Sequence, residues 1–320
     1  MRLDVHAHLW STEYLDLLQA HGVHEVAAYR HLGAGRTERE LDARFALLDK
    51  AGIDMQILSA TPLSPHLEDE QAAIDAARRI NDEYAELVAR YPTRFQAIAS
   101  LPLPHIDAAL RELERAFTQL NMLGACITTS VLGLSIANPL FEPLYQELNR
   151  RRSVLAIHPA GRGAHSPLIA DYALTWSIGA PIEDTVAAMH FILNGIPQRF
   201  PEMKIIVPHL GGLLPMTLER LDQTVAWEAP NTPEPPSRAA LRMWYDTVGH
   251  DQVPALQAAA ATFGAQRLLF GTDFPFQPGD LFQTTVDYIR RAGLPEEDVN
   301  AILDRNAAAL FGLQDVKRPS

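Results

Sequence analysis

Two histidines stand two positions apart near the start of the chain, within residues 2–8. Side chains at i and i+2 of a strand point to the same side, so His6 and His8 can aim both imidazoles at one point. This pattern places Leu3 and Val5 on the opposite face. Neutral imidazole is a common metal ligand. Ordinary surface or core histidines show the same spacing, so a metal site requires further ligands from elsewhere.

Histidine and aspartate residues that could also bind a metal stand at the ends of apolar runs later in the chain. His158 follows Ala156-Ile157, His209 precedes Leu210-Gly211-Gly212, and Asp273 lies in Gly271-Thr272-Asp273. Three histidines and one carboxylate form a ligand set that suits Zn²⁺, and also Mn²⁺ or Fe²⁺. Asp246 is a further candidate carboxylate near the end of another run. The alternative is that each of these residues has only a packing or capping role.

The elements that would position these residues are eight runs rich in apolar and β-branched residues. They span residues 2–8, 53–60, 95–103, 125–130, 154–159, 204–210, 241–248 and 268–274. Several runs are continuous rather than alternating in apolar character, which is typical of parallel strands buried on both faces. His6, His8, His158, His209 and Asp273 then all stand at carboxyl ends of strands.

Helical periodicity fills the segments between these runs. It is clear in 38–51, 69–91, 107–120, 139–151, 182–200, 213–227 and 253–263, and two more helices are expected in 281–292 and 295–310. Asp107 is the expected N-cap of its helix. Eight alternations predict an α/β fold of the (β/α)8 TIM-barrel type. The alternative, an open doubly wound sheet, usually has a glycine-rich turn after its first strand, which this sequence lacks.

Three segments are longer than a connection requires. Residues 11–37 and 161–180 follow expected strand ends, where barrels of this kind carry their active sites, so they are interpreted as lid and walls. Residues 229–240 precede the seventh strand and are expected to form a surface loop or a subunit contact on the opposite face. No domain linker is visible, which predicts one barrel domain over residues 1–320.

The composition excludes several classes of function. The net charge of −12, with 27 basic and 39 acidic residues, is opposite to the footprint of a nucleic-acid-binding protein. No apolar run approaches the ~20 residues of a membrane span, and no signal peptide is visible. Cys126 is the only cysteine, which fits a reducing compartment. We therefore expect a cytoplasmic protein without nucleic-acid or membrane partners.

The sequence resembles the amidohydrolase superfamily, and within it the branch of metal-dependent decarboxylases. This branch includes the 2-amino-3-carboxymuconate-6-semialdehyde, γ-resorcylate, 6-methylsalicylate and 5-carboxyvanillate types. The resemblance runs over nearly the whole chain and is weaker at 58–62, 94–95 and 176–179. Its strongest motifs are Asp4-Val5-His6-Ala7-His8, Ile157-His158-Pro159, Pro208-His209-Leu210-Gly211-Gly212 and Gly271-Thr272-Asp273-Phe274-Pro275-Phe276.

The resemblance implies a role for each matching residue. It implies one divalent metal, Zn²⁺ with Mn²⁺ as the alternative, and His209 as the unliganded catalytic histidine. Arg44 and Trp176 match substrate-binding positions, although Arg44 could equally be an exposed helix arginine and Trp176 ordinary loop packing. A homodimer is also implied, in which Arg220 serves the neighbouring site. The implied metal ligands are His6, His8, His158 and Asp273.

The lysines distinguish a one-metal from a two-metal site. Binuclear amidohydrolases bridge two metals with a carbamylated lysine at the end of strand four. The only lysines here are Lys50, Lys204 and Lys317, and the expected fourth strand ends in Ile127-Thr128-Thr129-Ser130 without lysine or glutamate. A mononuclear site is therefore predicted.

The predicted reaction is the non-oxidative decarboxylation of an aromatic or muconate-type carboxylic acid. A bound metal would act as a Lewis acid, and His209 would serve as general base or acid. Asp273 could relay a proton, and Arg44 would pair with a second carboxylate where one exists. The alternatives are a mononuclear hydrolase of a lactone, amide or acyl bond, and a non-catalytic barrel that only binds a ligand.

Overall fold

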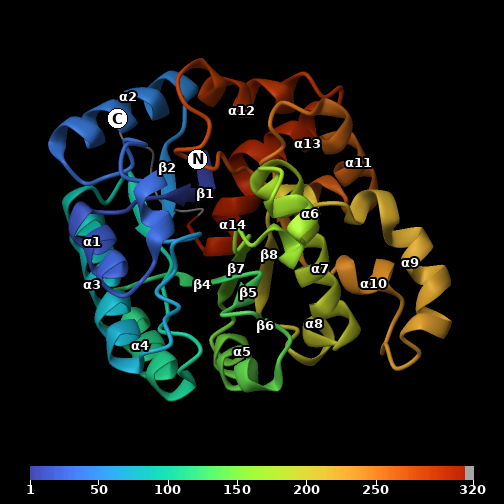
Figure 1. The fold of residues 1–320 in the computed structure, drawn as a ribbon. Coiled ribbons are helices and arrows are strands. Elements are labelled where there is room, and N and C mark those ends of the chain that lie inside the picture. Colours follow the sequence, from blue (N-terminus) through green and yellow to red (C-terminus); the bar gives the residue numbers. More distant parts are fainter. Residues whose placement is uncertain (314–320) are drawn as a thin grey trace.

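The computed structural model describes residues 1–313, so Lys317 lies outside the described residues. Its centre is a ring of eight parallel strands surrounded by helices (Figure 1). The strands, in chain order, are β1 (Leu3–His8), β2 (Met55–Ser59), β3 (Phe95–Ala97), β4 (Gly124–Thr128), β7 (Val154–His158), β8 (Lys204–Val207), β9 (Trp244–Asp246) and β10 (Leu268–Leu269). β5 (Ser130–Val131) and β6 (Leu134–Ser135) form a separate antiparallel ribbon after β4.

The ring consists of two parallel sheets, β1-β2-β3 and β4-β7-β8-β9-β10, that meet at two seams. The bridge between Ala99 and Ala125 joins β3 to β4, and the bridge between Ala7 and Phe274 joins β1 to the segment after β10. The order of strands around the ring therefore follows the chain, and the (β/α)8 fold expected from the sequence is confirmed.

Helices alternate with the strands and cover the outside of the ring (Figure 1). They are α1 (Thr12–Ala20), α2 (Glu38–Ala51), α3 (Glu70–Arg90), α4 (Ile106–Thr118), α5 (Glu142–Arg150), α6 (Pro167–Ala170), α7 (Ala180–Leu193), α8 (Ile196–Arg199), α9 (Leu214–Glu228), α10 (Pro236–Ala240), α11 (Val253–Phe263), α12 (Asp280–Arg290), α13 (Glu296–Asn300) and α14 (Asn306–Phe311). None of the described helices is long and apolar enough to cross a membrane.

Local signals explain where these helices begin and end. Thr37 and Glu40 form a capping box at the start of α2, and Gly52 ends it in the left-handed conformation with a φ of 65°. Asp69 caps α3 through the amide of Ala72. The cap predicted at Asp107 is wrong: α4 begins one residue earlier, and the residue before it makes no side-chain cap bond.

Two apolar layers hold the barrel together. The outer layer lies between strands and helices, and the inner cluster fills the ring with residues that include Leu3, Val5, Ile57 and Cys126. Leu310 and Phe311 of α14 belong to this inner cluster. Lys204, at the start of β8, donates to the carbonyl of residue 310, so α14 covers the amino-terminal ends of the strands.

The prediction that Leu3 and Val5 face away from the two histidines is wrong. The pairing of β1 with β2 shifts by one residue between Asp4 and Ala7, which is a β-bulge. The bulge changes the alternation of side chains, so both the apolar residues and the histidine pair face the interior of the ring. The lower barrel is therefore packed with hydrophobic side chains, and imidazoles lie above them.

The long segments carry structure of their own. Residues 11–37 contain α1 and a 3₁₀ turn (His24–Ala28), and 161–180 contain α6 and a π turn (Thr175–Gly179). Residues 229–240 contain α10, which packs on α9. The single barrel domain and the lid role of 11–37 stay predictions.

Gly212, which ends the turn after β8, offers a test of this backbone. Its φ of 62° and ψ of −120° suit only glycine, and an added Cβ would lie 2.3 Å from the carbonyl oxygen of Pro181. We predict that Gly212→Ala lowers the free energy of unfolding by about 3 kcal/mol. Gly133→Ala, at a φ of 83° in open space, should cost about 1 kcal/mol. Chemical denaturation of both variants measures the difference, and equal losses would contradict the prediction.

Candidate metal centre and pocket

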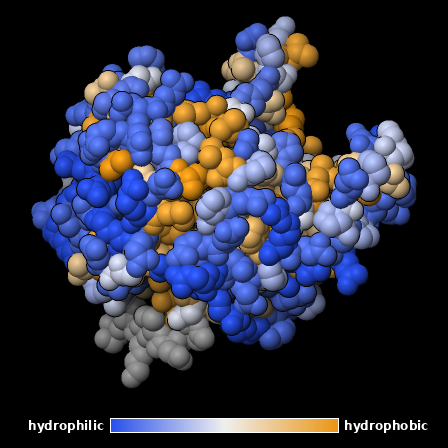
Figure 2. All heavy atoms as spheres, turned by 90° about the horizontal axis from the view of Figure 1, so that it is seen from below, coloured by the Kyte–Doolittle hydropathy of each residue, from blue (hydrophilic) through white to orange (hydrophobic). Residues whose placement is uncertain are grey.

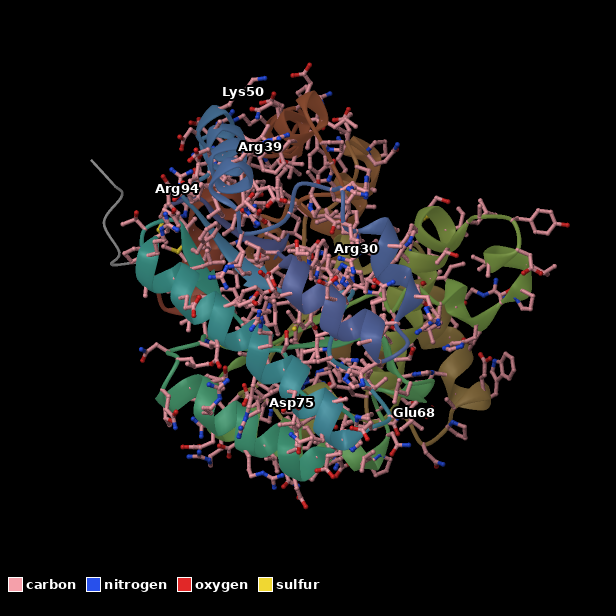
Figure 3. The ribbon with its side chains drawn as sticks, turned by 60° about the vertical axis from the view of Figure 1, so that its left-hand side comes forward. Arg30, Arg39, Lys50, Glu68, Asp75 and Arg94 are labelled. Atoms are coloured by element: carbon pink, nitrogen blue, oxygen red, sulfur yellow. The ribbon has the colours of Figure 1, made fainter. Side chains whose placement is uncertain are left out.

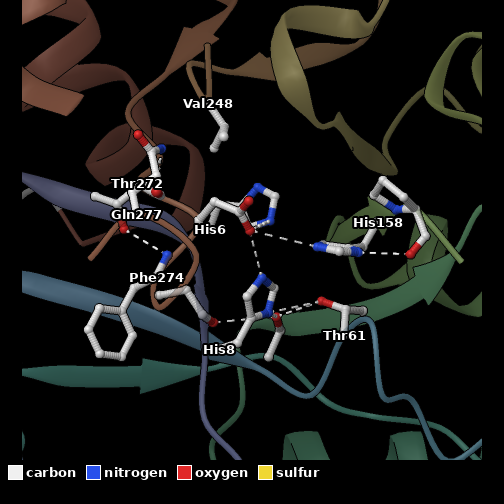
Figure 4. A network of polar contacts seen from close by, with 12 residues as sticks. His6, His8, Thr61, His158, Val248, Thr272, Phe274 and Gln277 are labelled. Atoms are coloured by element: carbon white, nitrogen blue, oxygen red, sulfur yellow. Dashed lines mark hydrogen bonds and ion pairs between the residues drawn. The ribbon is translucent and has the colours of Figure 1, made fainter. Parts of the chain in front are cut away.

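Four side chains meet at the carboxyl ends of the strands (Figure 4). One ligand atom from each of them lies within 4.8 Å of the others, and all four residues are buried. The Nε2 atoms of His6 and His8 each lie 3.1 Å from Oδ1 of Asp273, and that of His158 lies 3.9 Å from it. The structure thus brings together the four residues proposed from the sequence as metal ligands.

The donor atoms fit a divalent cation. Nε2 of His158 is buried and has no hydrogen-bond partner, and Nε2 of His6 is buried and lies near Asp273 without the geometry of a hydrogen bond. A buried polar atom without a partner is costly, and a metal ion at the centre of the cluster would remove that cost. Three imidazoles and one carboxylate are a ligand set found around Zn²⁺ and similar ions.

The other ring nitrogens of the three histidines are engaged. Nδ1 of His6 lies 2.7 Å from Oδ2 of Asp246, and Nδ1 of His158 lies 2.9 Å from the carbonyl of Pro159. Nδ1 of His8 lies 3.1 Å from Oγ of Ser59. Such contacts fix the ring orientation and the tautomer, leaving each Nε2 free to bind a cation.

The carboxylate of Asp4 holds the β1 bulge in place. It accepts the amide of His6 at 3.1 Å, and both the amide and the hydroxyl of Thr272 at 3.0 and 2.7 Å. Gln56 donates to it at 2.7 Å. Because Thr272 precedes Asp273, one carboxylate ties together the backbones that carry two of the four candidate ligands. The sequence motif contains Asp4, but nothing in its spacing predicted this contact.

His209 lies beside the cluster without belonging to it. Its Nδ1 lies 2.9 Å from Oδ2 of Asp184, and its Nε2 lies 3.8 Å from Oδ2 of Asp273. Its amide donates to Asp246, which also contacts His6. The residue has a φ of 51°, in the left-handed region, so the turn after β8 aims the ring at the cluster. The structure therefore forms an Asp184–His209 pair next to Asp273.

Asp184 was missed by the sequence analysis. It follows Glu183 near the start of α7, where acidic residues usually favour the helix dipole. Both are buried. The carboxylate of Glu183 accepts the amides of Ala160, Arg162 and Ala164, so it holds the chain after β7. No periodicity distinguishes these two acids from solvent-exposed ones.

Burial and charge shift the pKa values of these groups in opposite directions. Burial opposes the charged form of His6, but Asp246 and Asp273 outweigh it and raise the pKa to about 10. Burial lowers the pKa of His8 to about 3. Burial also opposes the charged form of His209, yet Asp184 and Asp273 raise its pKa well above the ordinary value. Without a cation, the carboxylates therefore hold protons on His6 and His209.

Arg44 lies in the layer between α2 and the strands, and it is fully buried. Its Nε donates to Gln56 at 2.6 Å, and its Nη1 donates to the carbonyl of His8 at 3.0 Å. The guanidinium lies 4.3 Å from the ring of Phe274 and 5.2 Å from that of Phe95. Arg44 does not line the cavity described below, so these contacts support a structural role, and its substrate-binding role stays a prediction.

Trp176 lines a cavity of about 900 Å³ beside the cluster, together with His158, His209 and Asp273. Its ring stacks on Phe276 with centroids 6.5 Å apart. A Cβ on Gly161 would meet the Trp176 ring at 2.6 Å, so this glycine allows the indole to sit where it does. Tyr29, from the long segment after β1, also contacts Phe276, edge to face with ring centroids 6.0 Å apart.

The described lysines lie away from the cluster. Lys50 is exposed on α2 and pairs with Asp280, and Figure 3 shows it at the outer edge of the helices. Lys204 contacts α14 at the opposite end of the barrel. The end of β4 carries Thr128 and Thr129, as the sequence indicated. Among the described residues no lysine is available to bridge two metals.

These features define a metal-dependent barrel enzyme, and the chain belongs to the amidohydrolase family, whose profile matches residues 3–313. It is 27% identical to 2-amino-3-carboxymuconate-6-semialdehyde decarboxylase of Dictyostelium discoideum, covering 99% of this chain and 93% of that protein. It is 32% identical to γ-resorcylate decarboxylase of a Polaromonas species, covering 85% and 87%. The resemblance to this decarboxylase branch is confirmed.

A solved structure agrees with these relatives. The dihydroxybenzoic acid decarboxylase of Polaromonas, with bound manganese and the inhibitor 2-nitroresorcinol, superposes with a TM-score of 0.84. The two chains are 27% identical, and the match covers 98% of each. The geometry of the four-residue cluster and this manganese-bound neighbour both support a divalent metal site.

Asp246 provides a test of the metal centre. We predict that Asp246→Asn weakens metal binding roughly 10- to 100-fold. The carboxylate orients His6 and raises the basicity of its imidazole, and the variant loses both effects. Competition with a chromophoric chelator measures the affinity. Asp287→Asn, at an exposed carboxylate on α12, is the matched control. Equal affinities in the two variants would show that Asp246 does not support the metal.

Proposed function

We propose that this protein is a metal-dependent decarboxylase that removes CO₂ from an aromatic carboxylic acid without oxidation. The observation that carries the proposal is the four-residue cluster beside the Asp184–His209 pair, at the end of a largely apolar cavity. The relatives named above are decarboxylases, which favours a lyase over the hydrolase alternative. A muconate-type acid is the other substrate class.

The metal in this proposal is one divalent ion held by His6, His8, His158 and Asp273. We propose Zn²⁺, because three imidazoles and a carboxylate suit it, with Mn²⁺ as the alternative suggested by the Polaromonas structure. Bound there, such an ion supplies Lewis acidity to the carboxylate end of the substrate. Metal analysis of protein purified without added chelator tests which ion is present.

The chain's own residues would manage the proton. Decarboxylation breaks a carbon–carbon bond and leaves its electron pair on the ring carbon, so one proton must arrive there as CO₂ leaves. His209 lies between Asp184 and Asp273, with its Nδ1 and Nε2 at 2.9 and 3.8 Å from their Oδ2 atoms, and both carboxylates favour its protonated form. Burial raises the pKa of Asp184 to about 6, and the contact with His209 limits that rise. The pair can thus store the proton near neutral pH and renew it.

The role of His209 is testable by removal. We predict that His209→Ala retains the metal but lowers kcat for an aromatic acid by about 10²- to 10⁴-fold. CO₂ release and metal content are measured on the same sample. His21→Ala, at an exposed histidine on the segment after α1, is the control. A variant with unchanged kcat would remove His209 from the proposed mechanism.

We also propose that the protein forms a homodimer through the region of α6 and α9. Large apolar side chains are exposed there, including Leu168 (77%), Tyr172 (73%), Met216 (81%) and Trp227 (73%). Figure 2 shows hydrophobic residues exposed among hydrophilic ones on the face that it draws. Large apolar side chains that are mostly exposed on one chain are often covered in an interface. Arg220 lies on α9, where a second copy could meet it.

A charge placed on this surface should separate the copies. We predict that Trp227→Glu shifts the protein from dimer to monomer in analytical ultracentrifugation, because the interface would bury an unpaired carboxylate. Leu281→Glu, at another exposed apolar residue on α12, should leave the dimer intact. A monomeric parent protein would refute the dimer.

The cytoplasmic location stays a prediction, and the presence of a single cysteine is the observation that favours it.

A further inference from the structure

The cavity beside the metal cluster has two unlike ends. Its inner end is formed by His158, His209 and Asp273, which offer charge and hydrogen bonds. The remainder lies where the first turns of α9 and α11 face Trp176 and Phe276. Its volume of about 900 Å³ is near the top of the range of about 300–1,000 Å³ for small-molecule pockets. One aromatic ring with its carboxylate would leave much of it unfilled.

The outer walls offer hydrophobic contact. α9 contributes Pro215 and Met216, and α11 contributes Pro254, Ala255 and Ala258. No lysine or arginine lines the cavity among the described residues. A second carboxylate among such walls would gain no cation. Met216, Pro254 and Ala255 are exposed, so it would keep part of its hydration, but it would still be less hydrated than in water, which is unfavourable.

The uncharged polar groups do not replace a cation. Beyond the inner end, the polar side chains that line the cavity are Ser177, His250 and Gln252. Burial lowers the pKa of His250, which favours its neutral form. Arg44 lies outside the cavity, with Nε and Nη1 bonded to Gln56 and to the carbonyl of His8.

The amino-terminal turns of α9 and α11 could in principle attract an anion. Residues 215 and 254 are prolines without an amide hydrogen. The amides of Leu213 and Met216 donate to Thr185 and to the carbonyl of residue 213. Those of Val253 and Ala255 donate to backbone carbonyls within 251–252. The dipoles of α9 and α11 alone would strengthen the binding of an anion by about two- to fivefold. This gain does not offset the cost of removing water from a carboxylate.

We propose that the cavity accepts a monocarboxylic aromatic acid whose ring carries an uncharged apolar substituent directed toward α9 and α11, and that it discriminates against a second carboxylate. This inference rests on the proposed decarboxylase function and selects one substrate class within it. The carboxylate meets the inner end, the ring lies against the Trp176–Phe276 pair, and the substituent fills the apolar remainder.

Three acids of the same ring test the proposal: 2-hydroxy-6-methylbenzoate, 2-hydroxy-6-pentylbenzoate and 2-hydroxyisophthalate. Turnover is measured with the metal-loaded enzyme, and binding is measured separately by calorimetry with metal-loaded His209→Ala. We expect the pentyl acid to bind at least tenfold more tightly than the methyl acid, because more apolar surface is buried. The dicarboxylate should bind at least tenfold more weakly than the methyl acid.

Paired variants on α11 test whether the preference for the pentyl acid and against the dicarboxylate arises in the cavity. Ala258 lines the cavity, whereas Ala261 is exposed and does not. Ala258→Leu should reduce the tenfold advantage of the pentyl acid to less than threefold, and Ala261→Leu should leave it unchanged. Ala255→Arg should strengthen binding of the dicarboxylate at least fivefold, and Ala261→Arg should not.

The outcomes separate the two proposals. If none of the three acids releases CO₂, decarboxylation of aromatic acids of this ring is wrong, and the calorimetric ranking still tests the cavity. If the dicarboxylate binds as well as the methyl acid or better, the substrate inference is wrong although the function stands. Loss of that binding in Arg220→Ala would then trace the cation to a second copy. A pentyl acid that binds no better than the methyl acid would also overturn the inference.

Discussion

The site depends on one buried carboxylate at the seam of the barrel. Asp4 receives four hydrogen bonds, from the amide of His6, the amide and hydroxyl of Thr272, and the side chain of Gln56. Burial raises the pKa of Asp4, and these donors oppose that rise by stabilising the anion. Because β1 and the chain after β10 are far apart in sequence, their candidate ligands can meet only while this seam holds.

The bulge in β1 and the carboxylate of Asp4 act together. Without the bulge, a regular strand would place the histidine pair on the opposite face from Leu3 and Val5. With it, apolar side chains fill the lower barrel and imidazoles occupy the end where the site lies. Arg44 extends the same network outward through Gln56, so an arginine that the family resemblance links to substrate contributes here to the frame around β1.

The parts of the site that the sequence predicted share one physical origin. The carboxyl ends of parallel strands converge, so polar residues that end apolar runs, such as His158 and Asp273, had to lie close together once the barrel was assumed. The eight strands and most helices followed from the same periodicity. Asp184 could not be found this way, because it comes from a helix whose acidic start looks exposed. The bulge was also hidden, since it depends on pairing with β2 rather than on local composition.

The charges of the site show why a cation, a proton store and an apolar cavity belong together. Asp246, Asp273 and Asp184 are buried, and without a cation their charges are met by protons on His6 and His209. A divalent ion among the four candidate ligands would take over part of that role and release the proton from His6. His209, which is outside the cluster, could keep its proton beside Asp184. The reaction turns a carboxylate into neutral CO₂, and the inner end of the cavity, where His158 and Asp273 are buried, stabilises the charged reactant less than water does. At this end the Asp184–His209 pair lies beside Asp273 and can supply the proton. The position of this pair therefore determines whether the proton reaches the ring carbon as CO₂ leaves.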